Sequence, residues 1–123
     1  PHDDPDSHLA NRYGSEMAAV KALVALDPAL AEPLVPGQPY IRAEAVYAVR
    51  CEMATTLVDV LTRRTRAHLR DRAACYIAAP GVAALLATEL CWSPEDTERH
   101  VAEYRALCDA ETEAATGRAA SPA

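Results

Sequence analysis

The chain has 123 residues, half of them apolar, and carries a formal net charge of −6. A chain of this length can form one domain that buries roughly two thirds of the surface exposed in the unfolded state. The acidic balance argues against general nucleic-acid binding, which usually needs a more basic domain. No run of eighteen apolar residues and no signal peptide is visible, so the sequence predicts no membrane span.

The four cysteines and four histidines do not have the spacing of a metal site. No Cys-x-x-Cys pair occurs, so we expect each cysteine to act as a small apolar residue in a reducing compartment. The four glycines form neither a phosphate-binding loop nor a dinucleotide fingerprint. The sequence therefore predicts no catalytic, cofactor-binding or metal-binding residue in this chain.

The N-terminal third of the chain is predicted to contain short helices joined by capped turns. Residues 1–6 are acidic and expected to fray, and a short helix is expected to begin at Asp6 or Ser7 and to run to Tyr13, before Gly14. An apolar stripe predicts a helix over 17–26. Asp27–Pro28 fits the cap and first position of a further helical turn, and residues 35–39 can only form a loop.

The stretch 40–71 holds most of the basic charge and mixes it with apolar residues at helical spacing. It predicts one helix over about 41–52 and a second over about 57–64. Thr56 and Asp59 have the spacing of a capping box at the start of the second helix. We expect a helix, a corner and a second helix.

Three arginines follow that second helix within four positions. Arg63, Arg64 and Arg66 would fan out over its last turn, where cations favour the helix dipole. Asp59 lies four residues before Arg63, which is the favourable order for a helical ion pair. Residues 42–72 contain seven bases and four acids, a net charge of +3, between two acidic ends. An anion or an acidic partner surface would complement this region.

The C-terminal half is predicted to contain further helices. Asp71 caps one of them, and Pro80 either kinks it or opens the next, with a new helix through about Cys91 favoured. Ser93–Asp96 is a strong start signal for the last helix. That helix is expected to fade before Gly117, and residues 116–123 are predicted to be a disordered tail.

Together these patterns predict an all-α domain over residues 7–115, a single compact bundle of five to seven short helices that is not a coiled coil. Two helices that meet at a corner also occur in helix-turn-helix DNA binders. An independent interaction module, or a DNA binder that uses the basic helix from Arg63 to Arg72, is therefore an alternative. A small independent enzyme is a third option for which the sequence offers no positive sign.

Three segments resemble one known family. They are His8-Leu-Ala-Asn-Arg-Tyr-Gly-Ser15, Ala43-Glu-Ala-Val-Tyr-Ala-Val-Arg-Cys-Glu52 and Asp59-Val-Leu-Thr-Arg-Arg-Thr65. With them the chain resembles the C-terminal helical domain of FAD-dependent glycerol-3-phosphate dehydrogenases, including α-glycerophosphate oxidases, from about residue 8 to residue 107. One departure is Cys51, where the family pattern leads us to expect histidine.

The resemblance implies a function for a larger parent protein. The family oxidises glycerol 3-phosphate to dihydroxyacetone phosphate and passes electrons through FAD to a quinone, or to oxygen in the oxidases. A preceding domain holds the flavin and the substrate. We therefore expect this chain, which begins at Pro1 without an initiator methionine, to bind no FAD and to be inactive alone. The parent is expected in the cytoplasm, and peripheral association with the inner face of the plasma membrane is left open.

The same resemblance implies that this domain packs on the flavin domain. We expect Arg63, Arg64 and Thr65 to face that domain, with Glu44 and Asp59 orienting the guanidinium groups. The alternative is that the arginines only decorate a helix end. The full set of expected interdomain contacts is Glu44, Tyr47, Glu52, Asp59, Arg63, Arg64 and Thr65.

Overall fold

The computed structural model describes the backbone of residues 17–120 and the side chains of residues 17–115, so the predictions for residues 1–16 lie outside it. The described residues form helices and loops, and the only β-type contact among them is an isolated bridge between Pro33 and Ile41. The all-α prediction is confirmed. The elements are α2 Met17–Leu26, the 3₁₀ turn η2 Pro28–Ala31, α3 Arg42–Cys51, the π-helix η3 Asp59–Arg64, α4 Ala67–Arg70, α5 Arg72–Leu90 and α6 Pro94–Ala120.

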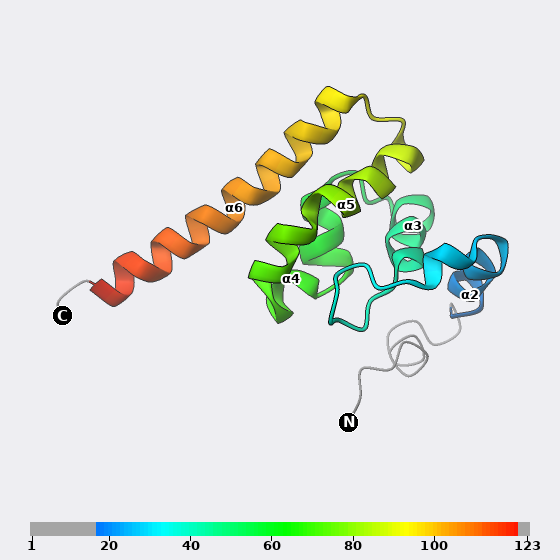
Figure 1. Ribbon diagram of the computed structural model, residues 1–123, viewed down its shortest axis with the longest axis horizontal. Coiled ribbons are helices and arrows are strands. Elements are labelled where there is room, and N and C mark those ends of the chain that lie inside the picture. Colours follow the sequence, from blue (N-terminus) through cyan, green and yellow to red (C-terminus); the bar gives the residue numbers. More distant parts are fainter. Residues whose placement is uncertain (1–16, 121–123) are drawn as a thin grey trace.

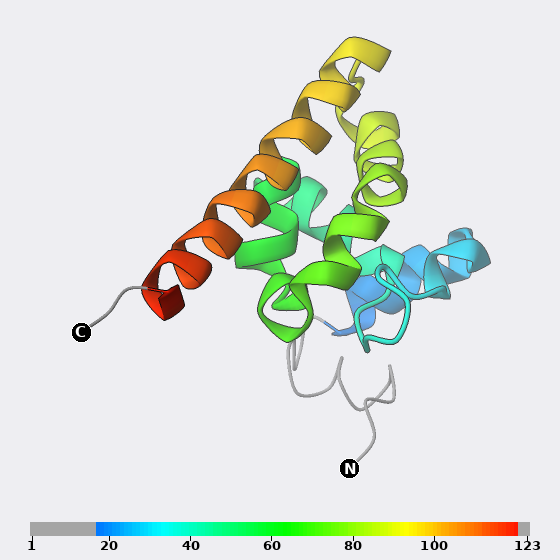
Figure 2. The ribbon, with the colours of Figure 1, turned by 60° about the vertical axis from the view of Figure 1, so that its left-hand side comes forward.

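The helices are arranged in sequence across the molecule. Helix α2 packs on α3, α3 packs on α5, and α5 packs on α6. Both ribbon views place α2 and α6 on opposite sides, with α3 and α5 between them (Figures 1 and 2). The C-terminal part of α6 extends beyond the rest of the domain (Figure 1).

Two clusters of apolar side chains hold these layers together. The smaller cluster joins α2 and η2 to α3 through residues that include Val20, Leu30 and Val46. The larger one joins α3, η3, α5 and α6, and its largest fully buried side chains include Leu57, Leu61, Leu86 and Tyr104. Small side chains at the buried positions of α3 and α5 allow the helices to approach closely.

The predicted start signals coincide with real caps. Asp27 accepts a hydrogen bond from the Ala29 amide at 3.2 Å, and Asp71 accepts one from the Ala74 amide at 3.0 Å. Such caps satisfy amide groups that have no partner inside the helix. The loop over 35–39 is also observed, and Gly37 adopts a φ of 85° in it.

Helix α5 runs through Pro80 without a break, so the prediction of a new helix at this position is wrong. Proline has no amide hydrogen to donate to the carbonyl four residues earlier, and its ring usually disrupts a helix interior. Here that carbonyl belongs to Tyr76. The guanidinium group of Arg105 on α6 donates to it instead, at 3.1 Å from Nε and 2.9 Å from Nη2.

By length and composition alone, α5 is apolar enough to cross a membrane, which the count of apolar residues in the sequence did not predict. The buried core helices of soluble proteins also meet this criterion of length and composition. Helix α5 packs between α3 and α6 and buries one face in the larger cluster, through Cys75, Ala79, Val82, Ala83 and Leu86. We interpret α5 as the central core helix of this domain.

The junction of α5 and α6 is a tight corner. Cys91 ends α5 with a φ of 58°, and the ring of Trp92 stacks on the imidazole of His100 with 3.8 Å between centroids. Ser93 and Asp96 form a reciprocal cap, with the Asp96 amide 3.0 Å from Ser93 Oγ and the Ser93 amide 3.2 Å from Asp96 Oδ2. The start signal at Ser93–Asp96 is thus confirmed.

Helix α6 continues to Ala120, past Gly117, where the sequence led us to expect a disordered tail over 116–123. Four alanines occupy the last seven positions of this helix. Alanine is the best helix former, and one glycine in an exposed helix costs only about 1 kcal/mol. Residues 121–123 lie outside the described part.

Two of the four cysteines behave as predicted. Cys75 and Cys108 are buried in the larger cluster, whereas Cys51 and Cys91 are exposed. Burial raises the pKa of the Cys75 thiol to about 11, so this thiol stays protonated and unreactive near neutral pH.

Candidate functional site

The corner between α3 and η3 contains most of the residues that the sequence singled out. Helix α3 ends at Cys51, and the chain then turns through Met53, whose φ is 60°. The amide of Ala54 donates back to the Ala48 carbonyl at 3.0 Å, which fixes the turn. A left-handed conformation costs a non-glycine residue roughly 1–2 kcal/mol, yet Met53 occupies it with 84% of its surface exposed.

Asp59 connects this turn to η3. Its amide donates to Thr56 Oγ1 at 3.0 Å, and its carboxylate accepts from the Thr55 amide at 3.4 Å. Asp59 Oδ1 also lies 3.7 Å from the guanidinium of Arg63, which is 77% exposed. The predicted cap and the predicted ion pair are both present. We call Cys51, Met53, Asp59 and Arg63 the corner surface.

Thr65 and Glu44 lie inside the domain, contrary to the expectation that Thr65 faces another domain and that Glu44 orients the arginines. Thr65 is 1% exposed; its hydroxyl donates to the Val60 carbonyl at 2.8 Å and accepts from the Ala67 amide at 3.3 Å. It therefore closes η3 and starts α4. Glu44 is 0% exposed and accepts from the Ile41 amide at 2.8 Å, as a cap of α3.

The remaining residues of the expected set occupy intermediate positions. Tyr47 is buried in the smaller apolar cluster. Glu52 and Arg64 are half-buried, and within the described residues Glu52 Oε1 and Arg64 Nε are buried without a hydrogen-bond partner. A buried polar atom left unpaired is unfavourable, and another surface or a rearrangement can relieve it. Only Arg63 of the expected set points openly to solvent.

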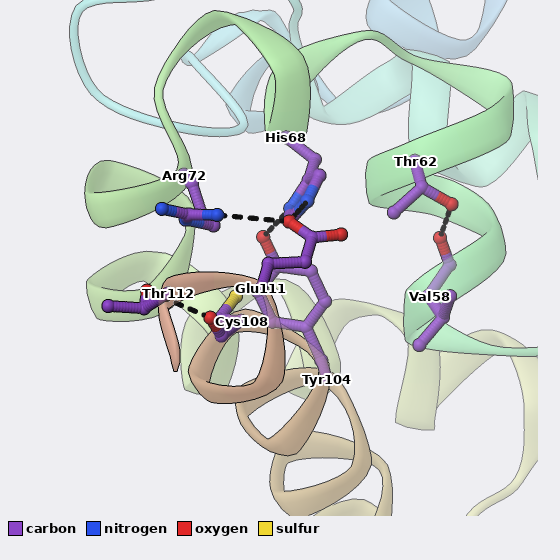
Figure 3. A network of polar contacts seen from close by, with 8 residues as sticks. All are labelled: Val58, Thr62, His68, Arg72, Tyr104, Cys108, Glu111 and Thr112. Atoms are coloured by element: carbon purple, nitrogen blue, oxygen red, sulfur yellow. Dashed lines mark hydrogen bonds and ion pairs between the residues drawn. The ribbon is translucent and has the colours of Figure 1, made fainter. Parts of the chain in front are cut away.

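A second polar site, which the sequence analysis missed, joins α4 and α5 to α6 (Figure 3). The imidazole of His68 lies 2.7 Å from the Tyr104 hydroxyl through Nδ1 and 2.8 Å from Glu111 Oε1 through Nε2. The guanidinium of Arg72 donates to the same carboxylate oxygen at 3.2 Å. We call His68, Arg72, Tyr104 and Glu111 the α6 clasp. Its one visible sequence signal is the spacing of seven between Tyr104 and Glu111, which places both on one helix face.

The electrostatics of the α6 clasp indicate a structural role. Hydrogen bonding from His68 lowers the pKa of the Glu111 carboxyl group, so this group stays ionised near neutral pH. Burial strongly raises the pKa of the Tyr104 hydroxyl, so the phenol stays protonated. The clasp thus pairs a carboxylate with its donors and holds a neutral phenol. Among the described residues no group of three His, Cys, Asp or Glu side chains could hold a metal ion.

The comparisons with known proteins agree with one family. A family model for the C-terminal domain of alpha-glycerophosphate oxidase matches residues 2–97. Glycerol-3-phosphate dehydrogenase 2 of Mycobacterium tuberculosis H37Rv is 38% identical over 104 residues, which cover 85% of this chain and 18% of that protein. Glycerol-3-phosphate dehydrogenase of Synechocystis is 34% identical over 97 residues, 79% of this chain and 18% of that protein.

A mitochondrial relative extends the same pattern. Mouse mitochondrial glycerol-3-phosphate dehydrogenase is 36% identical over 90 residues, 70% of this chain and 12% of that protein. The chain therefore spans less than a fifth of the length of these relatives. No solved structure matches the chain significantly. Because the family model covers most of the chain, we conclude that the chain belongs to the family of C-terminal domains of alpha-glycerophosphate oxidase.

Proposed function

We propose that this chain is the C-terminal domain of a larger FAD-dependent glycerol-3-phosphate dehydrogenase, which oxidises glycerol 3-phosphate to dihydroxyacetone phosphate. The observation that carries the proposal is the family match, which spans α2, α3, α4 and α5 together. The dehydrogenase names of the relatives, each matched over only a small share of its length, support a role as one part of a larger enzyme.

The flavin belongs to the rest of the parent protein in this proposal. A dinucleotide needs a glycine-rich turn between a strand and a helix. The glycines of the described residues lie in the loop over 35–39, in α5 and in α6, and none of them follows a strand. These residues do not fit FAD. When bound to the parent, FAD accepts the hydride of the substrate, and a quinone is the proposed acceptor of the electrons.

The role of this domain is then to pack on the flavin and substrate domain and to stabilise the assembled enzyme. Its exposed charges and apolar side chains support such a role, since they include Met53 and Arg63 on one corner. We place the parent in the cytoplasm, with the inner face of the plasma membrane as its site of peripheral association.

The test is reduction of the flavin in the purified parent protein. Addition of glycerol 3-phosphate without oxygen should bleach the flavin absorbance and drive reduction of an artificial dye, whereas this chain alone should do neither. A separately produced flavin domain should gain activity when this chain is added. A parent that contains no flavin, or whose flavin is not bleached by glycerol 3-phosphate, would contradict the proposal.

A further inference from the structure

Met53 has a large apolar side chain that lies outside the core of this chain. It is 84% exposed and adopts a φ of 60°, a conformation that glycine or asparagine adopts with less strain. With most of its surface exposed, the methionine side chain therefore adds little buried area to the core of this chain. An apolar side chain kept at a strained, exposed position points to a contact with a second surface.

The same corner surface presents a positive charge. Arg63 is 77% exposed, and its separation of 3.7 Å from Asp59 leaves the guanidinium open on its solvent side. It belongs to the stretch 42–72, which has seven bases and four acids in a chain of net charge −6. A complementary surface presents carboxylates to Arg63 beside an apolar pocket for Met53.

The carboxylates of the corner favour a protein over lipid headgroups or nucleic acid. The side chain of Asp59 is 25% exposed, and Glu52 carries a buried carboxylate oxygen with no partner among the described residues. A layer of phosphates would repel both groups, whereas a protein can place amide donors next to its own carboxylates.

We propose that the corner surface is the docking face of this chain and that its occupant is an acidic surface with an apolar pocket on the remainder of the parent enzyme. The inference rests on the proposed function, because it takes the flavin and substrate domain as the partner. In the assembled enzyme Met53 is buried in that pocket, and Arg63 pairs with carboxylates of the partner.

Two exposed native thiols make the proposal testable without any substitution in the protein. Cys51 lies two residues before Met53, and Cys91 lies at the C-terminal end of α5; both are exposed in this chain. Each thiol is labelled with a maleimide in this chain and in the full parent enzyme, and the rates are followed by mass spectrometry. Docking predicts that Cys51 reacts roughly tenfold or more slowly in the parent, and that its rate falls by a larger factor than the rate of Cys91. Equal rates for Cys51 would overturn the proposal.

Variants of the parent then identify the groups that make the contact. Met53→Asp and Arg63→Glu should restore fast labelling of Cys51. Leu26→Asp and Arg99→Glu are matched controls, since Leu26 is also 84% exposed and Arg99 is 57% exposed on α6. Docking predicts that both controls leave Cys51 protected. Protection that is insensitive to Met53→Asp and Arg63→Glu would assign the contact to another face.

The outcomes separate this proposal from the proposed function. A parent that oxidises glycerol 3-phosphate while Cys51 stays fully reactive would retain the function and reject the docking face. If Cys51 is protected in the parent but glycerol 3-phosphate does not bleach the flavin, the docking face is retained and the proposed function is rejected. Protection of Cys51 only after addition of anionic vesicles or duplex DNA would show that the occupant is not the parent protein.

Discussion

Arg105 on α6 donates two hydrogen bonds to the backbone carbonyl of Tyr76 on α5, at 3.1 and 2.9 Å, and its guanidinium lies 4.7 Å from the centre of the Tyr76 ring. This carbonyl is available because residue 80, its usual donor in a helix, is proline. The carbonyl that Pro80 leaves without a backbone donor on α5 is thus the attachment point of α6. The arrangement ties α6 to the middle of the core helix.

A double-mutant cycle at these positions tests the relationship. Arg105→Ala should lower the free energy of unfolding by about 1–3 kcal/mol, because it leaves the Tyr76 carbonyl without a donor. In the Pro80→Ala background the new backbone amide at this position can donate to the Tyr76 carbonyl, so the same change should cost clearly less. Urea unfolding of the four proteins measures the coupling, and strictly additive effects would contradict this account.

Glu111 is expected to matter for stability more than its neighbours on α6. Glu111→Gln removes the charge that His68 and Arg72 share, and we expect a loss of about 1 kcal/mol in the free energy of unfolding. The matched control is Glu113→Gln, because Glu113 is exposed on the same helix. Thermal or urea unfolding measures both, and equal effects of the two variants would argue against the α6 clasp.

The contribution of Glu111 should depend on pH in a defined direction. His68 lowers the pKa of the Glu111 carboxyl group from its ordinary value of 4.5. A carboxyl group whose pKa is lower in the folded state stabilises that state at pH values above its unfolded pKa, and this stabilisation is lost as the pH falls through the folded pKa. The difference in the free energy of unfolding between the unsubstituted chain and Glu111→Gln should therefore be largest near pH 6 and shrink below about pH 4.5. Urea unfolding across this range checks the trend, and a difference that grows on acidification would refute it.

Met53 should be suboptimal for the stability of this chain taken alone. Asparagine tolerates the left-handed conformation better, so Met53→Asn should raise the free energy of unfolding by up to about 1 kcal/mol. Leu26→Asn should produce no gain, because Leu26 is equally exposed at the end of α2 but does not have a positive φ. Thermal unfolding of this chain gives the comparison, and a destabilising effect of Met53→Asn would show that the methionine contributes to the fold.

Local signals predicted the parts of the fold that depend on neighbours in sequence. The caps at Asp27, Asp71 and Ser93 were predictable because the donor and acceptor of each cap lie within three residues. The pair of Asp59 and Arg63 was predictable for the same reason, since one helical turn brings them together.

Contacts across the bundle were not predictable in the same way. The continuation of α5 through Pro80 depends on Arg105, which donates to the Tyr76 carbonyl across 29 residues of sequence. The α6 clasp spans 36 residues between His68 and Tyr104 and 43 between His68 and Glu111. No pattern of neighbouring residues in the sequence reveals contacts between residues so far apart along the chain. The same limit applies to Thr65, whose burial depends on how η3 ends against the core.

The stacked pair at the junction of α5 and α6 has a practical consequence. Trp92 is the single tryptophan of the chain, and it lies face to face with His100 on α6. Its fluorescence therefore comes from one known place, where separation of α6 from α5 would remove the stacked ring. The protein carries its own optical reporter for the opening of this corner, and that reporter can be read without a dye.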